Sequence, residues 1–138
     1  MCLCVNVFMF TQKNTDMAKV ERFEDLKCWQ EARKLVKMVY EITNEWTFAK
    51  DYDMKSQIRR ASISTMNNIA EGFGRFSRKD FSRFLEISAT SASEVKSVCY
   101  AAIDINYLSE EKAKQIQNKA EEVKALDLGL IKYLNSQK

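Results

Sequence analysis

The chain contains no proline and only three glycines across its 138 residues. Sheet proteins of this length use these two residue types at many of their turns, so their scarcity favours helices. Apolar residues recur at the three- and four-residue spacing of an amphipathic helix through most of the sequence. Hydrophobic residues make up 46% and charged residues 30%, which is typical of a globular chain that can bury a core. These features predict an all-α domain.

Four long helices are expected, at residues 26–46, 54–73 and 78–106 and from Ser109 toward the C-terminus. A polar side chain that can accept a hydrogen bond from the first turn precedes each of them, namely Asp25, Asp53, Ser77 and Ser109. Residues 47–53 are expected to form a short connection. Short connections make consecutive helices antiparallel. The pattern therefore predicts an antiparallel up-down-up-down four-helix bundle over residues 23–138.

The first and third predicted helices are apolar over a wider face than a single neighbour covers. In the first helix, Trp29, Val36 and Trp46 follow one stripe, and Cys28 and Leu35 follow a second stripe beside it. The second stripe either belongs to a large core or packs between subunits. The residues alone leave both alternatives open.

Residues 1–22 precede the bundle and are expected to be an N-terminal extension. The first ten are apolar but too few to span a bilayer, and they lack the charged region and cleavage site of a signal peptide. Charge and helical periodicity begin at Met17, which suggests Met17 as the natural start. We expect a cytoplasmic protein that does not associate with membranes.

Little in the sequence supports catalysis. There is no histidine, which removes the most common general base and metal ligand. The four cysteines have no metal-binding spacing, and Cys28 and Cys99 fall on apolar helix faces, where they are expected to be small buried hydrophobes. We therefore expect no enzyme activity, no metal and no cofactor.

Positive charge is concentrated between residues 55 and 83. The whole chain has a net charge of +3, whereas this stretch has seven basic residues against two acids. A local basic surface can neutralise phosphates of a nucleic acid, and Phe73 and Phe76 could stack on bases if they are exposed. Alternatively, the basic residues form a solvated face or pair with nearby glutamates. The candidate nucleic-acid-binding residues are Lys55, Arg59, Arg60, Arg75, Arg78, Lys79 and Arg83.

The same stretch contains a polar motif. Asn68, Glu71 and Arg75 share one helix face and are expected to form a partly buried network beside the next turn. Gly72 and Gly74 are expected to adopt the left-handed conformation that ends helices. A small enzyme with a polar pocket at Glu71 is a weaker hypothesis, because one carboxylate without a second acid or base does not support acid–base hydrolysis.

Three stretches carry a resemblance to a known family: FEDLKCWQEARKLVKMVYEIT, QIRRASISTMNNIAEGFGR and FSRFLEISATSASEVKS. The chain resembles the four-helix bundle proteins encoded in intervening sequences of bacterial 23S ribosomal RNA genes over residues 23–132. It is also similar to the accessory variability proteins of diversity-generating retroelements. The sequence departs from the family pattern at Met66, where the family usually has proline.

This resemblance implies a four-helix subunit that assembles into a ring-like homopentamer and binds nucleic acid through a basic surface. We expect a non-enzymatic protein that contacts RNA or DNA backbone. An alternative is a protein-interaction scaffold for a reverse transcriptase or another element-encoded enzyme, in which the basic face meets an acidic protein surface.

Overall fold

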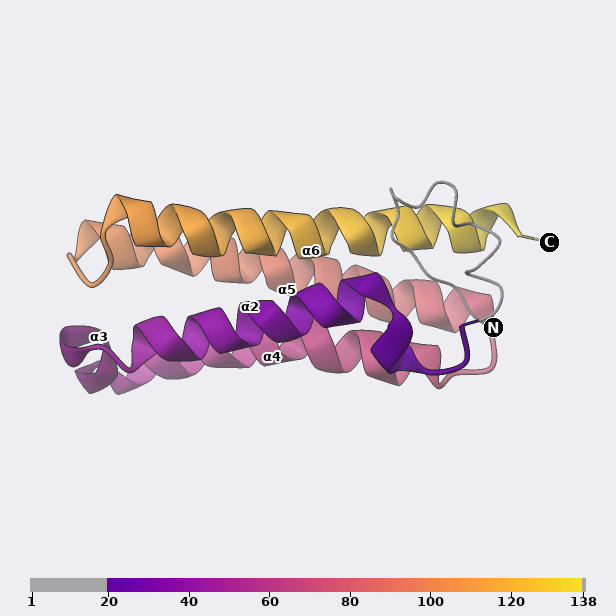
Figure 1. The fold of residues 1–138 in the computed structure, drawn as a ribbon, viewed down its shortest axis with the longest axis horizontal. Coiled ribbons are helices and arrows are strands. Elements are labelled where there is room, and N and C mark those ends of the chain that lie inside the picture. Colours follow the sequence, from indigo (N-terminus) through magenta and orange to yellow (C-terminus); the bar gives the residue numbers. More distant parts are fainter. Residues whose placement is uncertain (1–19, 138) are drawn as a thin grey trace.

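The computed structural model describes residues 20–137 and contains four long helices (Figure 1). Residues 1–19, and with them Met17 and most of the expected extension, lie outside the described part of the chain. The elements in order are η1 (Phe23–Asp25), α2 (Lys27–Thr43), α3 (Trp46–Lys50), α4 (Tyr52–Phe73), α5 (Arg78–Asp104) and α6 (Glu110–Ser136). The prediction of an all-α bundle is confirmed.

The four long helices lie side by side and run alternately in opposite directions (Figure 1). α2 packs against α4 and α6, and α5 packs against the same two helices. The α4–α5 turn and the end of α6 lie at one end of the bundle, and α3 and the α5–α6 turn lie at the other. We call these the turn end and the α3 end.

The core consists of aliphatic side chains from all four long helices. Leu35, Ile58, Leu85 and Leu130 are completely buried, which follows from their position on the apolar stripes. Small residues fill the contact between α4 and α5, where Ser64 and Ser91 share a hydrogen bond of 2.8 Å between their hydroxyls. The predicted burial of Cys28 and Cys99 is confirmed, and both are free thiols.

The starts of the helices agree with the sequence at two positions and differ at two. Ser77 accepts a hydrogen bond from the backbone N–H of Asp80, and Ser109 accepts one from Lys112, as predicted. Asp53 does not cap α4, because the helix begins earlier and Asp51 accepts from the N–H of Met54.

The predicted cap Asp25 is also wrong. Asp25 lies in η1, and the residue that precedes α2 is Leu26, which has no side-chain cap. Leu26 is completely buried. Burial of Leu26 in the core therefore fixes the start of α2, in place of the side-chain cap that was expected.

The connection between the first two long helices contains the short helix α3. The sequence predicted one helix through Trp46, but α2 ends at Thr43 and a new helix begins at Trp46. Phe48 anchors α3 because it is completely buried and packs on Tyr107, with 5.3 Å between the ring centroids. Trp46 consequently faces solvent with 75% of its surface exposed, so its predicted core position is wrong.

The glycines near the α4–α5 turn have a packing role. Gly72 lies inside α4, and neither it nor Gly74 has a positive φ, so the predicted left-handed ends are wrong. A Cβ on Gly72 would lie 2.7 Å from the Cβ of Phe84, so glycine is required there for the close approach of α4 to α5.

The left-handed helix end occurs after α5. Asn106 has φ 66°, and asparagine tolerates this conformation better than most residues. The N–H of Asn106 donates to the carbonyl of Ile103, and the N–H of Tyr107 donates to that of Ala102. These two bonds form a Schellman motif.

Within residues 20–137, no helix is long and apolar enough to cross a membrane.

Candidate nucleic-acid interface

The seven candidate basic residues are divided between the two ends of the bundle. Lys55, Arg59 and Arg60 lie in the first half of α4, near the α3 end. Arg75 follows α4, and the remaining three lie in the first turns of α5. At 1.5 Å per residue, Arg60 and Arg75 are separated by roughly 20 Å along the helix. The stretch that is continuous in sequence therefore forms two separate groups.

Arg59 is part of the internal structure of the α3 end. Its Nε donates to the Oγ1 of Thr43 at 2.8 Å, and its Nη2 donates to the Oδ1 of Asn44 at 2.9 Å. Its guanidinium carbon lies 4.1 Å from the ring centroid of Tyr40. These contacts connect α4 to the C-terminal end of α2, so Arg59 is a structural residue.

Lys55 and Arg60 have fewer partners. The ammonium group of Lys55 lies 5.9 Å from the ring centroid of Tyr52, and its side chain is half-buried. Arg60 is exposed. Neither forms an ion pair with a carboxylate of residues 20–137, so no paired acid offsets the positive potential around them.

At the turn end, Arg75 and Arg83 are paired with acids. Arg75 contacts Glu71 at 2.9 Å, and Arg83 contacts Asp80 at 3.4 Å. Both guanidinium groups also lie over the ring of Phe84, at 4.8 Å and 5.4 Å from its centroid. Each pair is exposed, so the Coulomb energy is small and the acid reduces the local positive potential.

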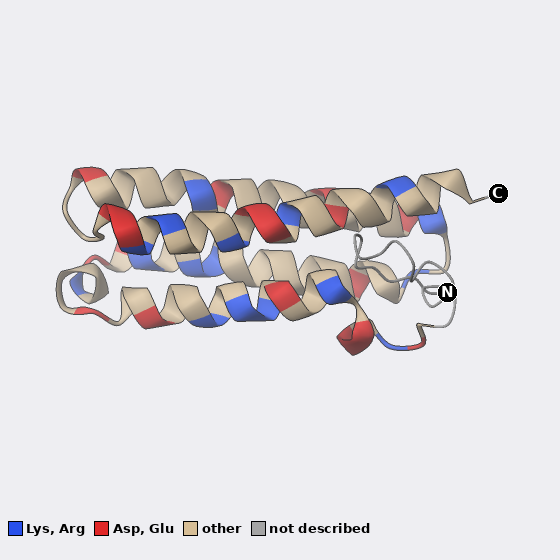
Figure 2. Cartoon of the chain, turned by 45° about the horizontal axis from the view of Figure 1, so that its top comes forward, with Lys and Arg blue, Asp and Glu red and all other residues tan. Residues whose placement is uncertain are grey.

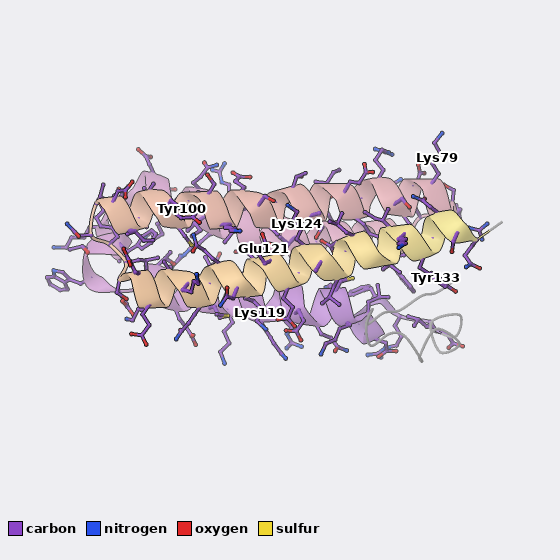
Figure 3. The ribbon with its side chains drawn as sticks, turned by 90° about the horizontal axis from the view of Figure 1, so that it is seen from above. Lys79, Tyr100, Lys119, Glu121, Lys124 and Tyr133 are labelled. Carbon is purple, nitrogen blue, oxygen red and sulfur yellow. The ribbon has the colours of Figure 1, made fainter. Side chains whose placement is uncertain are left out.

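Arg78 and Lys79 are the available cations of the turn end. Both are exposed, and Lys79 projects away from the bundle (Figure 3). Arg78 donates to the backbone carbonyl of Gln137 at 3.5 Å, a weak contact. No ion pair with a carboxylate in the described part of the chain involves either residue.

A surface hollow of about 820 Å³ lies beside Arg78 and Lys79. It is formed by the α4–α5 turn and the first turns of α5 on one side and by the last turn of α6 on the other. Its wall includes Phe76, Arg83 and Asn135.

The two phenylalanines have different environments. Phe73 packs edge-to-face on Phe81, with ring centroids 6.0 Å apart, and belongs to the margin of the core. Phe76 is fully exposed. Stacking on a base requires an exposed ring, and of these two rings only that of Phe76 is exposed.

The predicted network of Asn68, Glu71 and Arg75 is wrong as a single unit. Asn68 donates its amide to the backbone carbonyl and the hydroxyl of Ser64, at 2.8 Å and 2.9 Å. Glu71 is exposed and contacts Arg75. Asn68 therefore supports the α4–α5 contact through Ser64, while Glu71 and Arg75 form a separate surface pair.

The comparisons with known proteins agree with this architecture. The family model of the 23S rRNA-intervening sequence protein matches residues 24–127. The chain belongs to this family.

One solved structure is also similar to this chain. It is a protein of unknown function from the S23 ribosomal protein family of Bacteroides thetaiotaomicron. The two chains share 29% sequence identity, and the match covers 77% of this chain and 95% of the other, with a TM-score of 0.65. No curated protein shows a significant match.

The bundle contains a buried carboxylate, Glu31, that the sequence analysis did not identify. Glu31 is only 2% exposed and contacts Lys119 at 2.6 Å, Lys34 at 3.1 Å and Lys27 at 3.2 Å. Burial alone would raise its pKa, but the three lysines lower the pKa to about 2. Glu31 is therefore ionised and connects α2 to α6. The i, i+3 and i, i+4 spacing of Lys34 and Lys27 was the available sequence signal.

A second buried acid, Asp127, has the opposite electrostatic environment. Its side chain has no exposed surface, accepts a hydrogen bond from Ser88 and contacts no cation within residues 20–137. Burial raises its pKa well above the ordinary value, although the Ser88 hydrogen bond acts against this. Burial thus disfavours the charged form of Asp127, which serves as a hydrogen-bonding group in the α5–α6 contact.

Acidic and basic residues are interspersed along the helices of the bundle (Figure 2). Many of them form surface pairs, such as Lys96 with Glu121 at 3.0 Å and Lys112 with Glu45 at 2.8 Å. Exposed pairs of this kind contribute little stability. Each pair cancels charge locally, so the positive potential depends on the cations that have no carboxylate partner.

Proposed function

We propose that this protein is a non-enzymatic, nucleic-acid-binding bundle that contacts the phosphate backbone through Lys55, Arg60, Arg78 and Lys79. One observation carries the proposal: these four cations of the basic stretch meet no carboxylate in the described residues and are not bonded into the fold as Arg59 is. Unpaired cations bind phosphates and release counterions, with little dependence on sequence.

Two further points support this proposal. The family description refers to intervening sequences of 23S rRNA, which fits a nucleic-acid partner. In addition, Glu71, the centre of the alternative catalytic hypothesis, is exposed and paired with Arg75. A carboxylate engaged in an exposed ion pair is poorly placed to act as a general acid.

The decisive experiment is a binding titration of the full chain with a labelled RNA at two salt concentrations. Replacing Arg78 and Lys79 by glutamate should reduce affinity by more than about tenfold at low salt, because two phosphate contacts become repulsive. The control is Lys114→Glu with Lys124→Glu on α6, which changes the net charge equally. Equal losses in the two double variants, or absence of wild-type binding at low salt, would contradict the proposal.

We also propose that the subunit assembles into a homo-oligomer, with five copies implied by the family resemblance. Support comes from apolar side chains that remain exposed on the surface of the single chain. They include Ile87 and Tyr100 on α5 and Leu128 on α6. Burying such residues between subunits would stabilise an assembly. Light scattering of the purified protein at micromolar concentration tests this, and a monomeric mass would contradict it.

A protein-interaction scaffold is the second candidate function. The observation that favours it lies at the α3 end, where Trp46 and Tyr52 are 75% and 73% exposed. Exposed aromatic residues are enriched at protein interfaces. A partner that remains bound after nuclease treatment, and is lost in Trp46→Ala, would favour the scaffold over nucleic-acid binding.

A further inference from the structure

Phe76 occupies an unusual position for a large apolar side chain. It lies in the α4–α5 turn, with its ring fully exposed, and no other aromatic ring or cation of the described residues stacks on it. By contrast, the neighbouring Phe84 is covered by two guanidinium groups. The ring of Phe76 therefore has both faces available to a ligand.

The surroundings of Phe76 are chemically mixed. The hollow beside it contains the cations Arg78, Lys79 and Arg83 together with the acids Asp80 and Glu86. Asp80 is engaged by Arg83, so the charges of this hollow without an ion-pair partner among the described residues are Arg78, Lys79 and Glu86. The volume of about 820 Å³ lies within the range of small-molecule sites and is large enough for a nucleotide.

An exposed ring between cations favours one form of nucleic acid. In a duplex, the bases are stacked on one another and their faces are closed to a side chain, whereas an unpaired base offers a free face. We infer that Phe76 stacks on an unpaired base while Arg78 and Lys79 hold the adjacent phosphates, so that the turn end selects single-stranded over double-stranded nucleic acid. This inference rests on the proposed function.

The test compares three labelled ligands of one sequence: single-stranded RNA, single-stranded DNA and the RNA duplex. The full-length variants are Phe76→Ala, Phe76→Trp and, as a matched aromatic control at the other end, Trp46→Ala. Phe76→Ala should weaken both single strands by about fivefold or more, the lower end of the range for one stacked base. It should change duplex binding less than about twofold, and Phe76→Trp should restore single-strand affinity.

The salt dependence separates this inference from the proposed function. Phe76→Ala removes no phosphate contact, so the slope of log affinity against log salt should stay unchanged while the affinity falls. Comparable affinity for single strands and duplex, with no effect of Phe76→Ala, would overturn the inference and leave the backbone-binding proposal intact. Absence of binding by the wild-type protein would contradict both the inference and the backbone-binding proposal. A change in oligomer mass in Phe76→Ala would assign the ring to a subunit interface and also overturn the inference.

Discussion

At the α3 end of the bundle, Arg59 donates to Thr43 and Asn44 and covers the ring of Tyr40. At the turn end, Arg78 reaches only a backbone carbonyl at 3.5 Å, and Lys79 projects into solvent. Both ends belong to one continuous basic stretch of sequence. The difference arises from what lies opposite: the end of α2 gives Arg59 two side-chain acceptors, at 2.8 Å and 2.9 Å, whereas the end of α6 gives Arg78 one carbonyl at 3.5 Å across the hollow that Lys79 also lines.

The comparison shows that the identity of a basic residue does not decide its role in this bundle. The end of a helix leaves carbonyls and polar side chains without partners, and an arginine that reaches them becomes part of the fold. A lysine or arginine in the first turn of a helix meets the N–H groups of its own helix instead of acceptors, and for Arg78 the end of α6 adds only one carbonyl at 3.5 Å. Such a residue remains free for an external anion.

The largest expected effect concerns binding at the turn end. Arg78→Ala with Lys79→Ala should lower the slope of log affinity against log salt by about 1.4–1.8, because two phosphate contacts are lost. Arg75→Ala with Arg83→Ala should lower it by less, since both residues already have carboxylate partners. Filter binding across a salt series measures both slopes. A greater change in the second variant would show that the paired arginines are the ones that contact phosphate.

The next largest effect is expected on stability, through the packing of Gly72 at the turn end. Gly72→Ala should reduce the free energy of unfolding by about 1–3 kcal/mol, because its Cβ would overlap with Phe84 and Phe81 on α5. The control is Gly74→Ala, where a Cβ meets nothing closer than 3.6 Å and φ is −79°. That substitution should stabilise by about 0.4–1 kcal/mol. Urea unfolding measures both, and equal effects would contradict the close approach at Gly72.

A pair of adjacent arginines tests the α3 end. Arg59→Ala should cost about 1–2 kcal/mol in the free energy of unfolding, because two hydrogen bonds and a cation–π contact are lost. Arg60→Ala should change stability by less than about 0.5 kcal/mol and weaken nucleic-acid binding instead. If Arg59→Ala leaves the urea midpoint unchanged, the distinction between structural and available cations fails at this end.

The smallest expected effect on the free energy of unfolding concerns the capping residues of α4 and α5, Asp51 and Ser77. Hydrogen bonds from Met54 and Tyr107 lower the pKa of Asp51 from its ordinary value of 3.8. Its charged form therefore contributes stability above that value, and the contribution is lost as pH falls through the lowered pKa. Asp51→Asn should consequently differ from wild type near neutral pH and converge with it in acid.

The hydroxyl of Ser77 does not titrate, so it supplies the control for this prediction. Ser77→Ala should cost about 1 kcal/mol at every pH at which the protein is folded. Urea midpoints of the three proteins between about pH 3 and pH 7 measure both effects. An Asp51→Asn difference that persists unchanged in acid would show that the charge of Asp51 does not stabilise the α3 end.

Much of the fold follows from local pattern. The apolar stripes place residues such as Leu35 and Leu85 in the core, and the serines before α5 and α6 cap these helices. The α3 end was predicted least well. Helical periodicity continues from α2 into Trp46, and nothing local indicates that burial of Phe48 against Tyr107 from the α5–α6 turn would interrupt it.

The candidate site was predicted only as a set of residues. Their positive charge is a property of composition, and the acids that pair with Arg75 and Arg83 lie within one helical turn in the sequence, but the contacts that hold Arg59 depend on partners distant in sequence. Arg59 meets Thr43 and Asn44 across the α2–α4 contact. Periodicity does not identify such partners, because it reports which face of a helix is buried and not which neighbour covers it.

The sequence by itself determined the all-α class, the four long helices and most of the core, because these depend on residue spacing within one helix and on the absence of proline. The tertiary structure decided what each polar residue does. Burial raises the pKa of Asp127, whereas lysines lower that of Glu31, because of these two acids only Glu31 lies beside lysines of α2 and α6. In the same way, contact with the end of α2 made Arg59 structural, while the open surface beside the α4–α5 turn left Phe76, Arg78 and Lys79 exposed.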